Sequence, residues 1–358
     1  MDSMGNRYIR LFLPLALLIL SQSQLFAQKR ALCGTVEYNA VLYDQFPGQK
    51  TSEQAFENWI ARKIEEHKSS HQRNADLPAI RTIPVIFHII HSANSGVGHG
   101  VNISAEQVQS QIDVLNEDFR RLGNGYNEDP RGADIEVEFC LSLINEYNQV
   151  LPEPGIMRWS NWGPGYFSKT YMEGIIKPAT SQDPSRFLNI WVAQMTPGLA
   201  GYAQFPDSSG LQGLDVDGGL ADRDGVVVIP TAIGTIELGA TTMNMGRTAT
   251  HEIGHWLGLR HIWGDGTCTK DDYCSDTPRC SDPYFSTYPT CLHPSQCGST
   301  RMIENYMDYS EGICMNIFTR DQKSRMDVVL AYSPNRPYSE NIPTVCHPEN
   351  LSELAYAP

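Results

Sequence analysis

The chain has 358 residues, of which 41% are hydrophobic and 19% charged, a composition typical of globular domains rather than of a disordered tail. Its formal net charge is -14, and an acidic chain gains little from releasing the counterions of a phosphate backbone, so we expect no nucleic-acid partner. The length suffices for one large domain or two modest ones.

The N-terminus has the features of a signal peptide over residues 1–27. Arg7 and Arg10 precede the apolar run 11–20, and Ala27 ends a cleavage-site pattern. The alternative, a membrane anchor, is disfavoured because a helix that spans a bilayer needs about 20 apolar residues. We therefore expect a secreted protein, extracellular or periplasmic. In that oxidising compartment the nine cysteines form disulfides, and their odd number leaves one thiol over.

Residues 28–80 are predicted to form a pro-segment ahead of a catalytic domain over 81–358. The pro-segment is polar and weakly patterned, with one predicted helix from Ser52 to His67. The pattern changes at Ile83–Ile90, where a continuous apolar run predicts a buried strand.

The next elements follow the order of an α/β domain. Ser104 opens a predicted helix with Gln107 in the capping-box position, and the alternation from Ile135 to Leu141 predicts a strand. Two more strands are predicted over 187–192 and 226–229. This succession favours a sheet with helices packed against it.

Regular structure becomes sparse after His261. Cysteine, glycine, proline and aspartate dominate, and six of the nine cysteines fall between Cys268 and Cys314. A final helix is predicted from Thr319, again with a glutamine, Gln322, in the capping-box position.

The segment from His251 to His261, HEIGHWLGLRH, has the spacing of a catalytic zinc site. Residues four apart share a helix face, so His251 and His255 can direct their imidazoles at one metal, with Glu252 beside them. Gly258 can take a positive φ and turn the chain, which brings His261 back as a third ligand. Three protein ligands leave zinc the open position that catalysis needs.

Two residues of the downstream segment NYMDYS complete this hypothesis. Met307 is expected to form an apolar floor beneath the three imidazoles without touching the metal. The hydroxyl of Tyr309, two positions later, can hydrogen-bond the oxyanion that develops during the reaction.

The sequence resembles the metzincin zinc metallopeptidases, and among them the pappalysin family. The resemblance runs from Thr82 to Tyr332 and is carried by GRTATHEIGHWLGLRHIWGD, NYMDYS and CMNIFT, with FLNIWV and GYAQFP similar to a family strand and cleft rim. It implies an upper subdomain (81–261) with a twisted mixed sheet and helices, and an irregular, disulfide-tied lower subdomain (262–358).

The resemblance also implies a function, a secreted zinc endopeptidase acting on proteins or peptides. His251, His255 and His261 would bind zinc, Glu252 would act as general base on a zinc-polarised water, and Tyr309 would steady the intermediate. The segment GYAQFP would hold an extended substrate by strand addition. We expect a monomer with no membrane anchor in its mature form.

Latency is assigned to Cys33, the candidate odd cysteine of the pro-segment. A thiolate is a strong zinc ligand, so Cys33 at the fourth position would displace the catalytic water and keep the zymogen silent. The alternative is a disulfide from Cys33 to Cys140 or Cys346, which spacing does not exclude. Arg73 and Arg81 are candidate sites for the activating cut.

The family pattern further implies structural calcium and two disulfides. The stretch DYCSDT matches a calcium loop in which Asp272, Thr277 and the carbonyl of Ser275 supply oxygen ligands; the alternative is a solvated acidic turn. The implied disulfides are Cys268–Cys297 and Cys291–Cys314. Two additional cysteines, Cys274 and Cys280, are close enough in sequence to pair locally, and Cys140 with Cys346 could form a fourth bridge.

Substrate preference is the last expectation. Family members cleave before Arg or Lys because an acid at the bottom of the pocket pairs with the basic side chain. In this chain Gly312 stands at the acidic position, so the neighbouring Glu311 is the candidate acid, although a loop glutamate can equally face solvent. A catalytically silent zinc-binding module and a hydrolase of small amides are the competing functions, and retention of Glu252 argues against the first.

Overall fold

The computed structural model describes residues 32–38, 52–71, 80–206, 221–241, 244–286, 290–333, 335–337 and 343–346. The expected signal peptide and Arg73 lie outside these ranges. Within them, no helix is both long and apolar enough to cross a bilayer.

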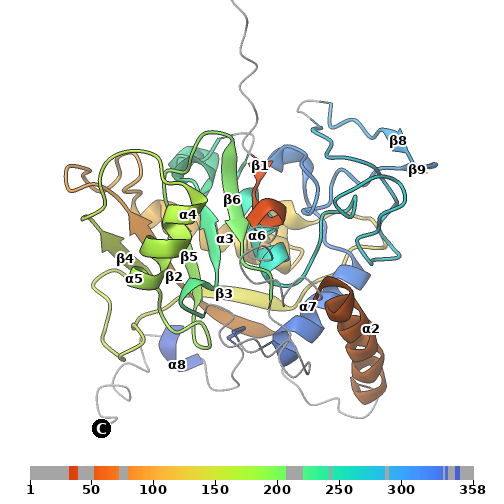
Figure 1. Ribbon diagram of the computed structural model, residues 1–358, viewed down its shortest axis with the longest axis horizontal. Helices are drawn as coiled ribbons and strands as arrows, with labels where there is room; N and C mark the ends of the chain where they lie inside the picture. The colour runs from red at the N-terminus through yellow and green to blue at the C-terminus, as the bar shows by residue number, and fades with distance from the viewer. Residues whose placement is uncertain are drawn as a thin grey trace, which may run out of the picture. The chain divides into compact units, whose positions relative to one another are not determined.

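A mixed sheet forms the centre of the domain and carries seven of the described strands (Figure 1). Its order is β1-β6-β7-β5-β2-β3. Strand β4 also pairs with β2, on the part of β2 that follows the residues paired with β3. All the pairings are parallel except that of β6 with β7. The bounds are β1 (Leu32–Cys33), β2 (Arg81–Ile90), β3 (Val137–Leu141), β4 (Ile156–Trp159), β5 (Leu188–Val192), β6 (Leu199–Ala203) and β7 (Val226–Val228).

Each face of the sheet is covered by helices. Alternate residues of β2, such as Phe87 and Ile89, face the larger core with α3 (Ala105–Phe119) and α6 (Arg247–Trp256). Ile90 faces a second core on the opposite side, under the continuous helix α4 (Lys169–Tyr171), η3 (Met172–Ile176) and α5 (Lys177–Thr180). The predicted α/β class with a mixed sheet is confirmed, and the expected positions of β2, β3, β5 and β7 are close to those observed.

Two helix starts follow the capping chemistry read from the sequence. Ser104 accepts from the amide of Gln107 at the start of α3, but the Gln107 side chain reaches the carbonyls of Pro230 and Ile233 instead of closing a capping box. Thr319 and Gln322 form a complete capping box at the start of α7 (Arg320–Tyr332). The helix α4–η3–α5 and strand β4 were not predicted.

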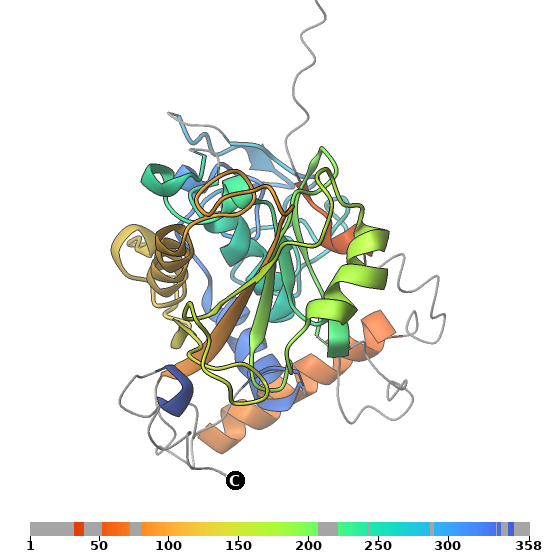
Figure 2. The ribbon, with the colours of Figure 1, turned by 90° about the vertical axis from the view of Figure 1, so that its left-hand side faces the viewer.

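The described parts of the expected pro-segment lie against the domain. Strand β1 pairs in parallel with β6 at the edge of the sheet and continues into a helical turn over 35–38 (Figure 1). Helix α2 (Ser52–His71) packs along α7 (Figure 2). Its inner face is apolar, with Phe56, Trp59 and Ile60 buried.

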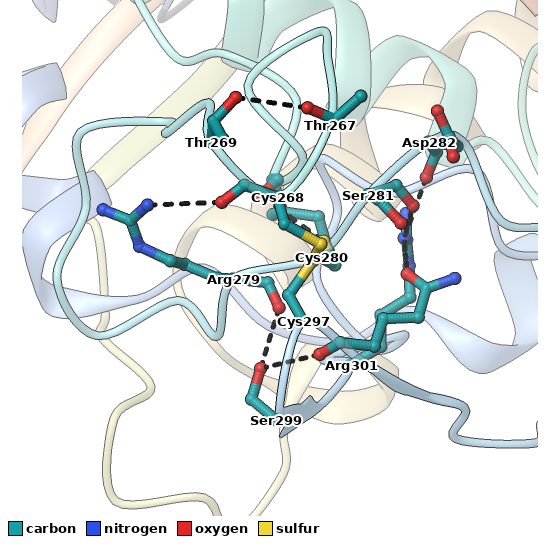
Figure 3. The surroundings of a disulfide bond; sticks show 12 residues. Thr267, Cys268, Thr269, Arg279, Cys280, Ser281, Asp282, Cys297, Ser299 and Arg301 are labelled. Carbon is teal, nitrogen blue, oxygen red and sulfur yellow. Dashed lines mark hydrogen bonds between the residues drawn. A yellow bond between two sulfur atoms is a disulfide. The ribbon is translucent and has the colours of Figure 1, made fainter.

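The lower part of the domain is irregular except for α7 and short pieces. These are β8 (Ser295–Gln296), β9 (Ser299–Thr300), η7 (Gly312–Cys314) and α8 (Pro343–Cys346); short helical turns elsewhere are η2 (Gly123–Gly125), η4 (Ala221–Arg223), η5 (Pro230–Ala232) and η6 (Ile236–Leu238). The described cysteines form the bridges Cys140–Cys346, Cys268–Cys297 and Cys291–Cys314. Around Cys268–Cys297, backbone carbonyls accept bonds from Arg279, Ser299 and Arg301 (Figure 3).

The expected local bridge between Cys274 and Cys280 is not formed, so that prediction was wrong. Both cysteines are free and buried. The Cys280 thiol faces the carbonyl of Ile262 at 3.5 Å, and the amide of Cys274 donates to Asp272. Cys33 is the third free cysteine, which excludes its alternative bridge to Cys140 or Cys346.

Candidate active site

The zinc motif begins on α6 and ends beyond its turn. Gly258 follows the helix with a φ of 85°, a conformation that other residues rarely adopt. The amides of Gly258 and Leu259 bond back to His255 and Gly254, so the helix closes tightly before the chain reverses. This reversal returns His261 to the face that carries His251 and His255.

The three histidines converge on one point. Their Nε2 atoms lie 3.2 Å apart for His251 and His261, and 3.1 Å for His255 with each of the other two. Three nitrogens bound to one tetrahedral zinc at about 2.0–2.1 Å lie about 3.3 Å apart, so the geometry fits that metal. Burial lowers the pKa of His251 and of His261 to about 3, which leaves both imidazoles neutral and able to donate a lone pair.

Hydrogen bonds at the other ring nitrogen orient each imidazole. The Nδ1 atoms of His251 and His255 donate to the carbonyls of Tyr306 and Leu259, at 2.6 and 2.8 Å. That of His261 donates to Asp265 at 2.5 Å. Each proton is thereby held on Nδ1, so the Nε2 lone pair points to the centre, the arrangement found around metal-binding histidines.

A second layer of contacts, which was not predicted from the sequence, fixes these supports. The carboxylate of Asp118, on α3, accepts from Thr250 on α6 at 2.7 Å and from the Tyr306 hydroxyl at 2.7 Å. It thus joins the zinc helix to the segment whose carbonyl holds His251. Trp263 stacks on His261 with ring centres 4.2 Å apart.

Met307, expected to form an apolar floor, packs against the helix of the zinc motif at Gly254. It is fully buried, and its carbonyl accepts from the amide of Ile262 just past the third histidine. A Cβ added at Gly254 would collide with the Met307 sulfur, so the first glycine of the motif is required for this packing.

Cys33 completes the cluster. Its sulfur belongs to a group with the three histidines in which all ligand atoms lie within 4.8 Å of one another. The residues present therefore fit a tetrahedral zinc with one sulfur and three nitrogen ligands. Cys33 reaches this position because β1 pairs with β6, and the amide of Gly34 bonds to the carbonyl of Gly201 at 2.9 Å.

Glu252 lies beside the histidines, and its carboxylate binds the same segment that carries Cys33. Its Oε2 accepts from the Thr35 hydroxyl at 2.9 Å and from the Cys33 thiol at 3.3 Å. Burial raises the pKa of Glu252 to about 8, against the opposing effect of these two bonds. Sequence analysis missed Thr35, whose hydroxyl also accepts from the amide of Ala203 on β6.

Tyr309 also contacts the cluster. Its ring centre lies 5.0 Å from that of His261 and 5.7 Å from that of His251. Its hydroxyl donates to the carbonyl of Cys33 at 3.3 Å. The structure thus brings together the three histidines, Glu252, Met307 and Tyr309, with Cys33 between Glu252 and Tyr309.

The expected calcium and specificity residues lie outside this cluster. The Asp272 side chain is 3% exposed, and both of its carboxylate oxygens accept from the Thr277 hydroxyl at 2.8 Å. Burial raises the pKa of Asp272 to about 8. The amide and hydroxyl of Ser275 donate to Asp321 on α7. Glu311 is half-buried and begins the turn η7, with its amide bound to the carbonyl of Ser286.

Comparisons with known proteins agree on one family. The family model described as pregnancy-associated plasma protein-A, a peptidase family designated M43, matches residues 179–331. An extracellular metalloprotease of Arthroderma otae is 32% identical over 258 residues, 71% of this chain and 80% of that protein. One from Colletotrichum graminicola is 30% identical over 276 residues, 75% of this chain and 83% of that protein.

Solved structures agree. Mature mirolysin of Tannerella forsythia, in complex with a cleaved peptide, is 31% identical with a TM-score of 0.65, covering 76% of this chain and all of that one. A promirolysin mutant from the same organism is 30% identical with a TM-score of 0.64, covering 80% of this chain and 94% of that one. The chain therefore belongs to the M43 peptidase family, the pappalysins, and is a zinc metalloendopeptidase.

Proposed function

We propose that this chain is a secreted zymogen that becomes active when the segment carrying Cys33 is removed. The observation that carries the proposal is the position of that thiol, within 4.8 Å of all three histidine nitrogens. In the latent form Cys33 would hold the fourth zinc position, with the imidazoles of His251, His255 and His261 at the other three. A promirolysin form among the structural relatives is consistent with a precursor.

The mature enzyme would hydrolyse peptide bonds through Glu252. Zinc, when bound, supplies a Lewis acid that polarises the scissile carbonyl and lowers the pKa of water. Glu252 would accept the proton from the attacking water and pass it to the leaving amine. Its Oε2 becomes free for this task once Cys33 and Thr35 leave. Tyr309, whose hydroxyl now binds the Cys33 carbonyl, would then donate to the oxyanion of the intermediate.

Secretion and processing follow from the N-terminal region. Residues 1–27 would direct export, in keeping with relatives that are named extracellular. Of the two candidate activating cuts, that at Arg73 is favoured over that at Arg81. Arg81 begins β2, its amide bonds to the carbonyl of Glu136, and its guanidinium lies 3.2 Å from Asp327. A protease would have to unpair a strand to cut there.

Two finer features belong to the same proposal. Calcium would bind at Asp272, with Thr277 and the Ser275 carbonyl, because a buried carboxylate whose pKa is raised gains from a cation. Glu311 would select Arg or Lys after the scissile bond.

One experiment tests the central claim. Full-length chain and processed chain are compared on casein, with Glu252→Ala in both forms as the control. We expect hydrolysis by the processed chain alone. Equal activity of the full-length chain would refute latency, and activity of processed Glu252→Ala would refute the assigned chemistry.

A further inference from the structure

We propose that the outer face of the sheet carries a tyrosine-binding pocket, filled by Tyr38 in the precursor and opened to tyrosine-containing peptides in the mature enzyme. The inference rests on the proposed removal of the pro-segment. Its occupant in the precursor is seen directly, because Tyr38 is 3% exposed and belongs to the core beneath α4–η3–α5.

Tyr38 reaches this pocket from β1, which pairs alongside β6 at the edge of the sheet. Thr35 bonds to Glu252 on the active-site side, and the amide of Tyr38 then closes one helical turn onto the carbonyl of Gly34. The turn lies next to the helix α4–η3–α5, and Lys169 of that helix donates to the same Gly34 carbonyl at 3.1 Å (Figure 2). The ring of Tyr38 packs 5.3 Å from that of Tyr202 on β6.

The alternation of β6 places the pocket and the active site back to back. A Cβ added at Gly201 would lie 3.0 Å from Glu252, so this residue faces the active site. The next residue, Tyr202, faces the outer core with Tyr38. A peptide that lies along β6 and turns over its edge can therefore reach the zinc site and the pocket together.

The carboxylate of Glu173 forms the inner end of the pocket and is held in place by Tyr202 and Lys177. Glu173 Oε2 accepts the Tyr38 hydroxyl at 2.8 Å, and Oε1 accepts from the Tyr202 hydroxyl at 2.7 Å and Lys177 at 2.6 Å. Glu173 and Lys177 lie four residues apart where the helix widens into a π-turn, a geometry frequent at functional sites. When Tyr38 departs, Glu173 Oε2 loses its donor and Lys177 loses one of its aromatic neighbours, while the Glu173–Lys177 pair and the Tyr202 bond do not depend on Tyr38.

The arrangement selects a neutral aromatic donor. Lys177 is wholly buried, lies over the rings of Trp191 and Tyr202, and already balances the charge of Glu173. A second cation would therefore meet a neutralised carboxylate and a like charge. Phenylalanine would fill the same space but leave a buried carboxylate oxygen without a donor. A phenol satisfies both the apolar walls, which include Met172 and Ile176, and the oxygen at their end.

The test uses enzyme activated from the full-length chain and a synthetic peptide of residues 31–38. The peptide carries Cys33→Ala, which removes zinc ligation from the measurement. Affinity is measured by calorimetry for this peptide and for versions with Tyr38→Phe, Tyr38→Ala and Val36→Ala; Val36 is 40% exposed and is the matched control. We expect the Phe version to bind about tenfold more weakly, the loss of one hydrogen bond to a charged acceptor. The Ala version should bind more weakly again, and the Val36→Ala version unchanged.

Equal affinity of the Tyr and Phe peptides would overturn recognition of the phenol, and equal affinity of the Ala peptide would overturn the pocket. A Glu173→Gln enzyme provides the reciprocal measurement and should reduce the difference between Tyr and Phe peptides. Failure of the proposed function gives a different result: Cys33→Ala in the full-length chain would then leave activity unchanged. Because peptide affinity and hydrolysis by the full-length chain are separate measurements, the two failures are distinguishable.

Discussion

The Thr35 hydroxyl donates to Glu252 at 2.9 Å, from the same three-residue segment that sets the Cys33 sulfur beside the zinc ligands. The pro-segment thus occupies the candidate base and the metal position together. Under the proposed latency, these are two contacts that can be removed separately.

The first prediction separates them. Cys33→Ala in the full-length chain should raise basal peptide hydrolysis, and adding Thr35→Val should raise it further, because Glu252 Oε2 then loses both donors. A quenched fluorescent peptide provides the measurement. Cys274→Ala, which removes another buried free thiol, is the control and should stay latent. A Cys33→Ala precursor as silent as wild type would contradict the switch.

Glu252→Ala should abolish turnover while zinc stays bound, because the three histidine ligands and their supports remain. Loss of a general base costs roughly a hundredfold or more in rate. Metal analysis and turnover are measured on the same sample. Retention of more than about one per cent of activity would exclude Glu252 as the base.

Asp265→Asn should weaken zinc binding by about ten- to a hundredfold, since outer partners of metal-binding histidines have effects of that size. Its carboxylate holds Nδ1 of His261 at 2.5 Å. Competition with a zinc chelator measures the affinity. Asp282→Asn, at an exposed aspartate with the same positive φ, is the matched control. Identical zinc affinities for Asp265→Asn and Asp282→Asn would show that His261 binds zinc equally well without the Asp265 carboxylate.

Calcium should raise the melting temperature of the enzyme, because a ligand that binds only the folded state stabilises it by mass action. Melts are compared in calcium, in magnesium and in a calcium-selective chelator. Asp272→Ala should remove the calcium response. An unchanged response in this variant would assign any stabilisation to another site.

Glu311→Gln should reduce cleavage before Arg or Lys far more than cleavage before Leu, because a carboxylate pairs with a basic side chain and an amide does so weakly. A peptide library profiled with both enzymes makes the comparison. A wild-type profile dominated by apolar residues after the cut would end the basic preference and leave the family assignment intact.

The sequence predicted the elements whose signals are local. The continuous apolar run of β2 and the capping residue Thr319 required no knowledge of the fold. Helix α4–η3–α5 was missed because its π-turn interrupts the 3.6-residue period that reveals a helix. Strand β6 contains glycine and small residues, and its role depends on pairing with β7 and β1.

The residues of the candidate site likewise divide into those predicted from a local motif and those that were missed. The histidine spacing and Gly258 are contained in one motif, so their convergence could be predicted. Thr35 and Asp118 act across long sequence separations, and no periodicity relates them to α6. The Cys274–Cys280 pairing failed because proximity in sequence does not set the direction of a side chain.

The ion pairs of Glu57 link maturation to the stability of the domain. Glu57 lies on α2 and bonds to Arg325 and Arg260, and the wholly enclosed Arg325 also donates to the carbonyl of Gly258, the turn of the zinc motif. Removing one partner of a buried pair costs about 3–5 kcal/mol. If α2 departs with the pro-segment, the mature protease keeps the buried Arg325 but loses its counter-ion, Glu57, which is present only in the precursor. The precursor is then the more stable of the two proteins.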